Sequence, residues 1–127
     1  MQRTAFYFEN LTVYQRALTF SLNIYTCSQK WPREHLFGIT DQLRRASLSI
    51  PLNIAEGYSR SRKDFGHFLT IARGSCFECV PIIKIVQSLG LLTPKDAELF
   101  YNEILEISQM LSGLRTALIR KSLNSKF

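Results

Sequence analysis

Residues 93–118 read TPKDAELFYNEILEISQMLSGLRTAL, and this stretch decides the fold. Thr93 followed by Pro94 is typical of a helix start, with a side-chain cap before a proline in the first turn. From there, apolar residues recur at alternating spacings of three and four: Ala97, Phe100, Ile104, Ile107, Leu111, Leu114 and Leu118. This periodicity predicts an amphipathic helix over about residues 94–121, with one continuous apolar face.

The same periodicity predicts three earlier helices, over about residues 11–31, 39–57 and 64–89. The second helix has one inner face, formed by Ile39, Leu43, Ala46, Ile50 and Ile54. The inner face of the third consists of Phe65, Leu69, Ala72, Cys76, Cys79 and Ile83. Four helices with short connections predict an all-α, antiparallel up-down-up-down four-helix bundle, with residues 1–127 as a single domain.

The first helix differs because it carries two apolar stripes. One contains Leu11, Tyr14, Leu18, Leu22 and Tyr25. The second contains Val13, Ala17, Phe20, Ile24, Cys27 and Trp31. A helix of a monomeric bundle usually has one such stripe, so the second stripe needs a partner outside the four-helix core. We therefore expect an oligomer.

Capping residues mark several helix ends. Asn10 or Thr12 can cap the first helix and Pro32 ends it, while Ser61 or Asp64 can cap the third. These polar side chains satisfy backbone N–H groups that have no partner within the helix.

Glycines and prolines add further expectations. Gly57 and Gly90 can end the second and third helices, because glycine adopts a left-handed conformation without strain. Pro51 and Pro81 fall inside these helices, where each removes a backbone hydrogen bond and favours a kink.

Composition excludes several classes of protein. The 127 residues are 46% hydrophobic, enough to bury a core, and six glycines with four prolines are too few for a β-sandwich. The three cysteines are typical of free thiols in a reducing compartment. Neither an apolar signal segment nor a membrane span is recognisable. We expect a cytoplasmic protein with no membrane partner.

A motif string covers the second and third helices. It reads QLRRA at 42–46 and SIPLNIAEG at 49–57, followed by DF at 64–65, FL at 68–69, IA at 71–72, GS at 74–75 and Glu78. The string resembles the bacterial four-helix-bundle family encoded in intervening sequences of 23S rRNA genes, the S23 family. The accessory variability protein of diversity-generating retroelements is similar to this family.

The resemblance implies a left-handed bundle assembled as a homopentamer, without enzymatic activity. For the retroelement relative, it implies a basic pentameric surface that binds RNA and a reverse transcriptase. For most members of the family the molecular role is unknown. Cys76 and Cys79 depart from the family pattern, so any role of these thiols would be specific to this protein.

Polar residues also lie at helical spacing beside the apolar faces. They are Arg44, Arg45, Ser49, Asn53, Glu56, Ser75 and Glu78. We expect Arg44 or Arg45 to pair with Glu56 or Glu78, and Asn53 with Ser75 or with a carbonyl freed by Pro51. Such a network would fix helix register and oligomer state. A binding or catalytic site and simple exposure are the alternatives.

Metal and cofactor chemistry find little support in the sequence. No Glu-x-x-His pair is present, as di-metal bundles require, and Cys76 and Cys79 lie in mid-helix with at most Cys27 as a third zinc ligand. We interpret the two thiols as small buried hydrophobes, and we expect neither a metal nor a cofactor.

Basic residues form two clusters that an up-down bundle brings to the same end. One is the turn with Arg60, Arg62 and Lys63, and the other is the final segment with Arg115, Arg120, Lys121 and Lys126. Sixteen lysines and arginines against ten acidic residues give a net charge of +6. Repeated around an oligomer axis, the clusters are candidates for binding phosphate backbones. Complementarity to the helix dipole explains the final segment equally well, but not the turn before a helix N-terminus.

These observations favour a non-enzymatic homo-oligomeric scaffold or adaptor that contacts RNA, a ribonucleoprotein or a nucleic-acid-processing protein. No exposed aromatic rings for base stacking are evident, so any RNA binding is expected to be sequence-tolerant. A protein-interaction or structural module without nucleic-acid contact is the main alternative. An enzyme that uses the Asn, Glu and Arg side chains of the second helix is a third, weaker one.

Overall fold

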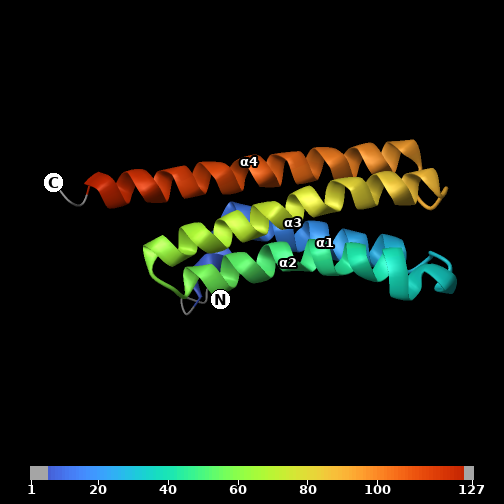
Figure 1. Ribbon diagram of the computed structural model, residues 1–127, viewed down its shortest axis with the longest axis horizontal. Coiled ribbons are helices and arrows are strands. Elements are labelled where there is room, and N and C mark those ends of the chain that lie inside the picture. Colours follow the sequence, from blue (N-terminus) through green and yellow to red (C-terminus); the bar gives the residue numbers. More distant parts are fainter. Residues whose placement is uncertain (1–5, 125–127) are drawn as a thin grey trace.

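A computed structural model describes residues 6–124 of the chain, with side chains described up to Lys121. Within that range four long helices run antiparallel in the order up-down-up-down, which confirms the predicted fold class (Figure 1). The helices are α1 (Thr12–Ser28), α2 (Asp41–Tyr58), α3 (Arg62–Ser88) and α4 (Pro94–Asn124). Short helical segments precede α1 and connect it to α2: η1 (Tyr7–Asn10), η2 (Arg33–His35) and η3 (Leu36–Thr40).

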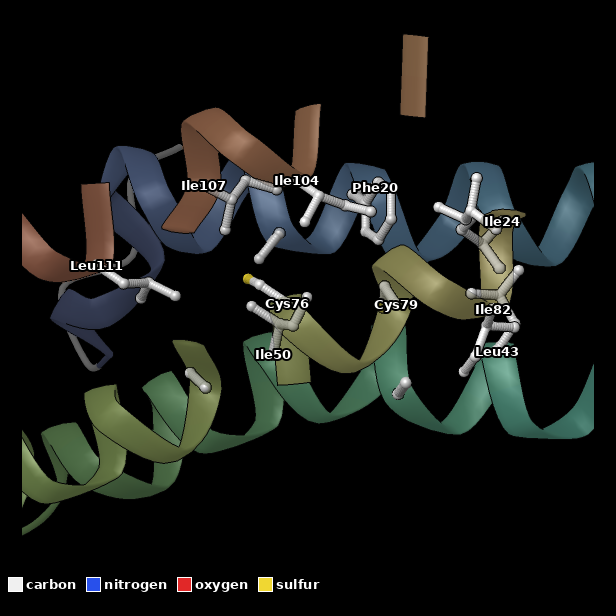
Figure 2. Packing of buried hydrophobic residues seen from close by; sticks show 14 of the residues in the cluster. Phe20, Ile24, Leu43, Ile50, Cys76, Cys79, Ile82, Ile104, Ile107 and Leu111 are labelled. Carbon is white, nitrogen blue, oxygen red and sulfur yellow. The ribbon is translucent and has the colours of Figure 1, made fainter. Parts of the chain in front are cut away.

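One apolar core runs along the bundle. The predicted inner faces of α2, α3 and α4 all lie in it or against it. Figure 2 shows side chains from all four helices meeting there, including Phe20, Ile50, Cys76 and Ile107, which are almost completely buried. Burial of such side chains stabilises the fold by about 1.5–3 kcal/mol each.

The two stripes of α1 exchange the roles that we assigned to them. The stripe with Val13, Ala17, Phe20 and Ile24 is buried in the core, whereas Leu18, Leu22 and Tyr25 are 48%, 64% and 52% exposed. Both stripes have helical spacing, so periodicity alone did not indicate which one faces α2, α3 and α4. The stripe that the four-helix core leaves exposed is therefore the one through Leu22.

Gly57 does not end α2, contrary to the prediction, because the helix continues to Tyr58. A Cβ atom at Gly57 would lie 2.5 Å from the Cβ of Phe68 and 3.0 Å from Cδ1 of Phe65. The glycine therefore permits a close approach of α2 and α3. Gly90 does follow the end of α3 with a φ of +78°, a left-handed conformation that favours glycine.

Two of the predicted caps are confirmed and one is wrong. The Asp64 backbone N–H donates to Oγ of Ser61, and that of Asp96 donates to Oγ1 of Thr93. At α1 the N-cap residue is Leu11, without a side-chain cap, and the helix ends at Ser28 rather than near Pro32.

The helices pack unequally. The α2–α3 and α3–α4 pairs make the most extensive contacts, whereas the contact between α1 and α4 is much less extensive. Both Pro51 and Pro81 lie inside helices that continue through them. The last turns of α4 extend beyond the turn between α2 and α3 (Figure 1).

Candidate nucleic-acid interface

The two basic clusters lie at the same end of the bundle, because the α2–α3 turn and the C-terminal part of α4 both reach it (Figure 1). Arg62 and Lys63 are exposed as the first two residues of α3. On α4, Arg115, Arg120 and Lys121 are exposed as well. Lys126 lies outside the described residues. The topology thus brings together residues from separate parts of the sequence; we call this region the basic end.

Arg60 is only partly available at the basic end. Its Nη2 lies 2.5 Å from Oε1 of Glu56, one helical turn earlier, and its guanidinium lies 5.5 Å from the ring centroid of Phe68. The hydrogen bond that Arg60 donates to Glu56 raises the pKa of Arg60, so the side chain remains a cation. An ion pair at this exposed position leaves the guanidinium free to exchange partners.

Arg73 is a basic residue that the sequence reasoning missed. Together with Arg115 it lines a groove of about 240 Å³ between α3 and α4. A signal was present, because Arg73 lies eleven residues after Arg62 and so falls on the same face of α3. Arg73 also packs its guanidinium 4.5 Å from the ring centroid of Phe77.

Part of the predicted polar network is present between α2 and α3. The hydroxyl oxygens of Ser49 and Ser75 lie 2.8 Å apart, and the amide of Asn53 donates to Oγ of Ser49 at 2.9 Å and to its backbone oxygen at 2.8 Å. Asn53 therefore reaches Ser75 through Ser49 rather than directly. The carbonyl freed by Pro51 belongs to Ser47, four residues earlier, so it is not the one that Asn53 contacts.

The predicted ion pairs of the network are wrong. Nε of Arg44 donates to Oγ of Ser28 at 2.8 Å, and its guanidinium lies 4.3 Å from the ring centroid of Tyr25. Arg45 instead pairs with Asp41 at 2.8 Å within α2. The partners of Arg44 lie on α1, and spacing along the chain gives no information about the register between helices. The pair of Arg45 with Asp41 is an i,i+4 contact within α2.

The two carboxylates of that prediction also have other partners. Glu56 pairs with Arg60, and Glu78 accepts a hydrogen bond from Nε2 of Gln42 at 2.6 Å. Only the cluster of Ser49, Asn53 and Ser75 thus remains connected as a network.

An ion-pair cluster that the sequence reasoning missed joins α1 to α4. Arg16 donates from Nε and Nη2 to the two carboxylate oxygens of Glu103, at 2.9 and 2.7 Å, and it also pairs with Glu106. The hydrogen bonds that Arg16 donates to these carboxylates raise its pKa above the ordinary value. The cluster joins two helices that are in much less extensive contact than the α2–α3 and α3–α4 pairs.

Comparison with known proteins decides the family. Residues 9–113 match the family described as 23S rRNA-intervening sequence protein. The chain belongs to this family. The match confirms the resemblance carried by the motif string on α2 and α3.

A solved structure from Bacteroides thetaiotaomicron, described as a protein with unknown function from the S23 ribosomal protein family, has a similar fold. The two chains are 25% identical, the similarity covers 82% of this chain and 95% of that chain, and the TM-score is 0.75. None of the curated proteins compared with the chain matches it.

The three cysteines of the chain are free thiols. Cys76 and Cys79 lie fully buried on the inner face of α3, as predicted for small hydrophobes. Burial raises the pKa of the Cys76 thiol to about 12 and raises that of Cys79 as well, so both remain neutral at physiological pH. Among the described residues, no group of three His, Cys, Asp or Glu side chains could hold a metal ion.

Exposed aromatic rings contradict the expectation that none is available for base stacking. Phe77 on α3 is 55% exposed and Tyr101 on α4 is 49% exposed, and both line a groove of about 280 Å³. Helical periodicity had not identified them because neither belongs to a predicted apolar stripe. None of the described helices is long and apolar enough to cross a membrane.

Proposed function

We propose that this protein is a non-enzymatic, homo-oligomeric scaffold or adaptor of the cytoplasm that contacts RNA or a ribonucleoprotein through its basic end. The proposal rests on the meeting of two clusters at one end of the bundle (Figure 1). Exposed cations there include Arg62, Lys63, Arg120 and Lys121. A surface of this kind attracts phosphate backbones and releases their counterions.

Dipole complementarity alone does not account for the basic end. Lys121 lies in the last turn of α4, where the helix dipole favours cations. Arg62 and Lys63 are the first two residues of α3, where the same dipole disfavours them. An anionic partner provides a reason for cations at this second position.

The test is the binding of a fluorescent single-stranded RNA at several salt concentrations. We expect the affinity to fall steeply as salt rises, and the double variant Arg62→Gln/Lys63→Gln to bind more weakly with a shallower salt dependence. Arg33→Gln/Lys95→Gln is the matched control, because it removes two exposed charges at the opposite end of the bundle. Binding that does not respond to salt, or equal effects of both double variants, would contradict RNA contact through the basic end.

We also propose that the homo-oligomer, a pentamer as the family resemblance implies, forms through the exposed stripe of α1. Leu18, Leu22 and Tyr25 on α1 are about half exposed or more, and so are Leu48 and Leu52 on the adjacent α2. Apolar side chains clustered on one surface favour association. The expected result is a pentameric mass by light scattering.

Leu22→Glu tests the stripe directly, because a buried and unpaired carboxylate opposes association. We expect this variant to be monomeric, whereas Leu89→Glu, the same change at an exposed leucine just after α3, keeps the wild-type mass. A wild-type protein that is a monomer at all concentrations would overturn the proposed assembly.

The same stripe favours the second candidate function, a protein-interaction or structural module without nucleic-acid contact. A stable oligomer that binds no RNA at any salt concentration would establish this alternative over the first.

A further inference from the structure

The groove between α3 and α4 that holds Arg73 and Arg115 lies toward the basic end of the molecule. Its volume is about 240 Å³, and Leu69 and Leu111, both buried, form its floor. The remaining lining is polar or charged: Thr70, Arg73, Ser112, Arg115 and Thr116. These polar and charged side chains distinguish the groove from the mainly apolar grooves elsewhere on the bundle.

Acidic residues are absent from the helix segments that form this groove. On α3 there is none between Asp64 and Glu78, and the sequence has none after Glu106. Within the described part of the chain, no carboxylate forms an ion pair with Arg73 or Arg115. Two like charges beside one groove repel each other, and a bound anion would remove that cost.

Several donors at the groove are free to bind a ligand. Thr70 donates its hydroxyl to the backbone oxygen of Gly66, but Ser112 and Thr116 form no hydrogen bond with any described residue. Ser112 and Thr116 are one turn apart on α4 and flank Arg115, so the three share one side of the helix. Arg73 is held on the ring of Phe77, which restricts the guanidinium before any ligand arrives.

We propose that this groove binds a phosphate group. Guanidinium groups match the geometry of phosphate oxygens with paired hydrogen bonds, and the two hydroxyls can donate to the same anion. The phosphate could belong to an RNA backbone or to a free phosphate compound. The inference deepens the proposed function. It rests on that function only if the bound phosphate belongs to RNA.

The experiment uses the full chain with two probes, a fluorescent single-stranded oligouridylate and inorganic pyrophosphate. The groove variant is Arg73→Gln/Arg115→Gln, and the opposite-end variant Arg33→Gln/Lys95→Gln again removes the same charge elsewhere. We expect the groove variant to bind the RNA at least about tenfold more weakly, with a salt slope shallower by about 1.4 for two lost phosphate contacts. Pyrophosphate binding, measured by calorimetry, should be lost only in the groove variant.

Arg115→Lys provides a second variant that keeps the charge but loses the paired hydrogen bonds, so its affinity should fall between those of the wild type and the groove variant. Thermal unfolding confirms that each variant is folded. Unchanged binding of both probes by the groove variant, equal losses in both double variants, or no binding of either probe by the wild type would overturn the inference. Pyrophosphate binding without RNA binding would uphold the groove and reject the proposed contact with RNA.

Discussion

Gly57 shows how one missing side chain sets the distance between two helices. It is buried inside α2, and the space that a Cβ would need is occupied by Phe68 and Phe65 of α3. The sequence indicated a special role for this glycine but suggested a helix end. Glycine is favoured both at left-handed helix ends and where two backbones approach closely, and only the packing in the structure distinguishes these two roles.

Gly57→Ala should therefore destabilise the protein. An added methyl group 2.5 Å from the Cβ of Phe68 forces the helices apart, at a cost of about 1–3 kcal/mol that exceeds the gain in helix propensity of up to about 1 kcal/mol. Gly74→Ala is the matched control, because Gly74 lies within α3 with open space around it, and the change should stabilise. Urea unfolding measures both, and equal stability of the two variants would contradict this account.

The buried thiols predict a dependence of stability on pH. Burial raises the pKa of Cys76 to about 12 and also raises that of Cys79, whereas an unfolded cysteine titrates near about 8.5. Above that pH the unfolded thiols lose protons while the folded ones keep them, so the free energy of unfolding falls as pH rises toward 12. Each thiol contributes a slope of up to about 1.4 kcal/mol per pH unit.

The comparison for this prediction is Cys76→Ala/Cys79→Ala, unfolded by urea between pH 8 and pH 11. Other groups titrate in both proteins. The informative quantity is therefore the difference between the two proteins in the slope of unfolding free energy against pH. The unfolding free energy of the double variant should decline less steeply with pH than that of the wild type. Identical declines would mean that the thiols do not contribute to the pH dependence.

At the scale of helices, periodicity predicted most of what the structure shows. The inner faces of α2, α3 and α4 follow from spacing, because a helix in a bundle has one side to bury. The α1 stripes could not be assigned in this way, since both have the same period. Contacts between helices were the weakest part of the prediction: Arg44, Arg45, Glu56 and Glu78 all have partners other than those expected. The partners of Arg44 and Glu78 lie on other helices and depend on register, which is set by packing. Arg45 and Glu56 instead pair with residues four positions away along the chain, a spacing that the sequence does show.

The ion pair between Arg16 and Glu103 should contribute to the attachment of α1 to α4. Both side chains are 32% exposed, so solvent screening limits the effect of Glu103→Gln to about 0.5–1 kcal/mol of unfolding free energy. Glu98→Gln changes a carboxylate of α4 that forms no ion pair with a described residue, and it should have almost no effect. High salt should reduce the difference between the two variants, and a difference that persists undiminished would show that the loss is not electrostatic.

At the scale of the whole molecule, the position of the basic end was predictable, because chain direction in an up-down bundle fixes which turns meet. The groove with Arg73 and Arg115 was not, because its two sides come from helices whose relative rotation the sequence does not give. The net charge of +6 measures an excess of cations but not their arrangement. The arrangement separates a basic end from an exposed apolar stripe on α1, so RNA contact and self-association can use different surfaces.

The length of α4 has a consequence for local opening. Among the side chains of this helix that are described, up to Lys121, Leu111 is the last buried one, yet the helix continues to Asn124, about 20 Å further at 1.5 Å per residue. Between Leu111 and Lys121 only partly buried side chains such as Leu114 and Leu118 pack against the core. We therefore expect the amide protons of these turns to exchange with solvent through small openings rather than through global unfolding. The cations at the end of α4 therefore sit on a segment that can fray and re-form while the core below it stays closed.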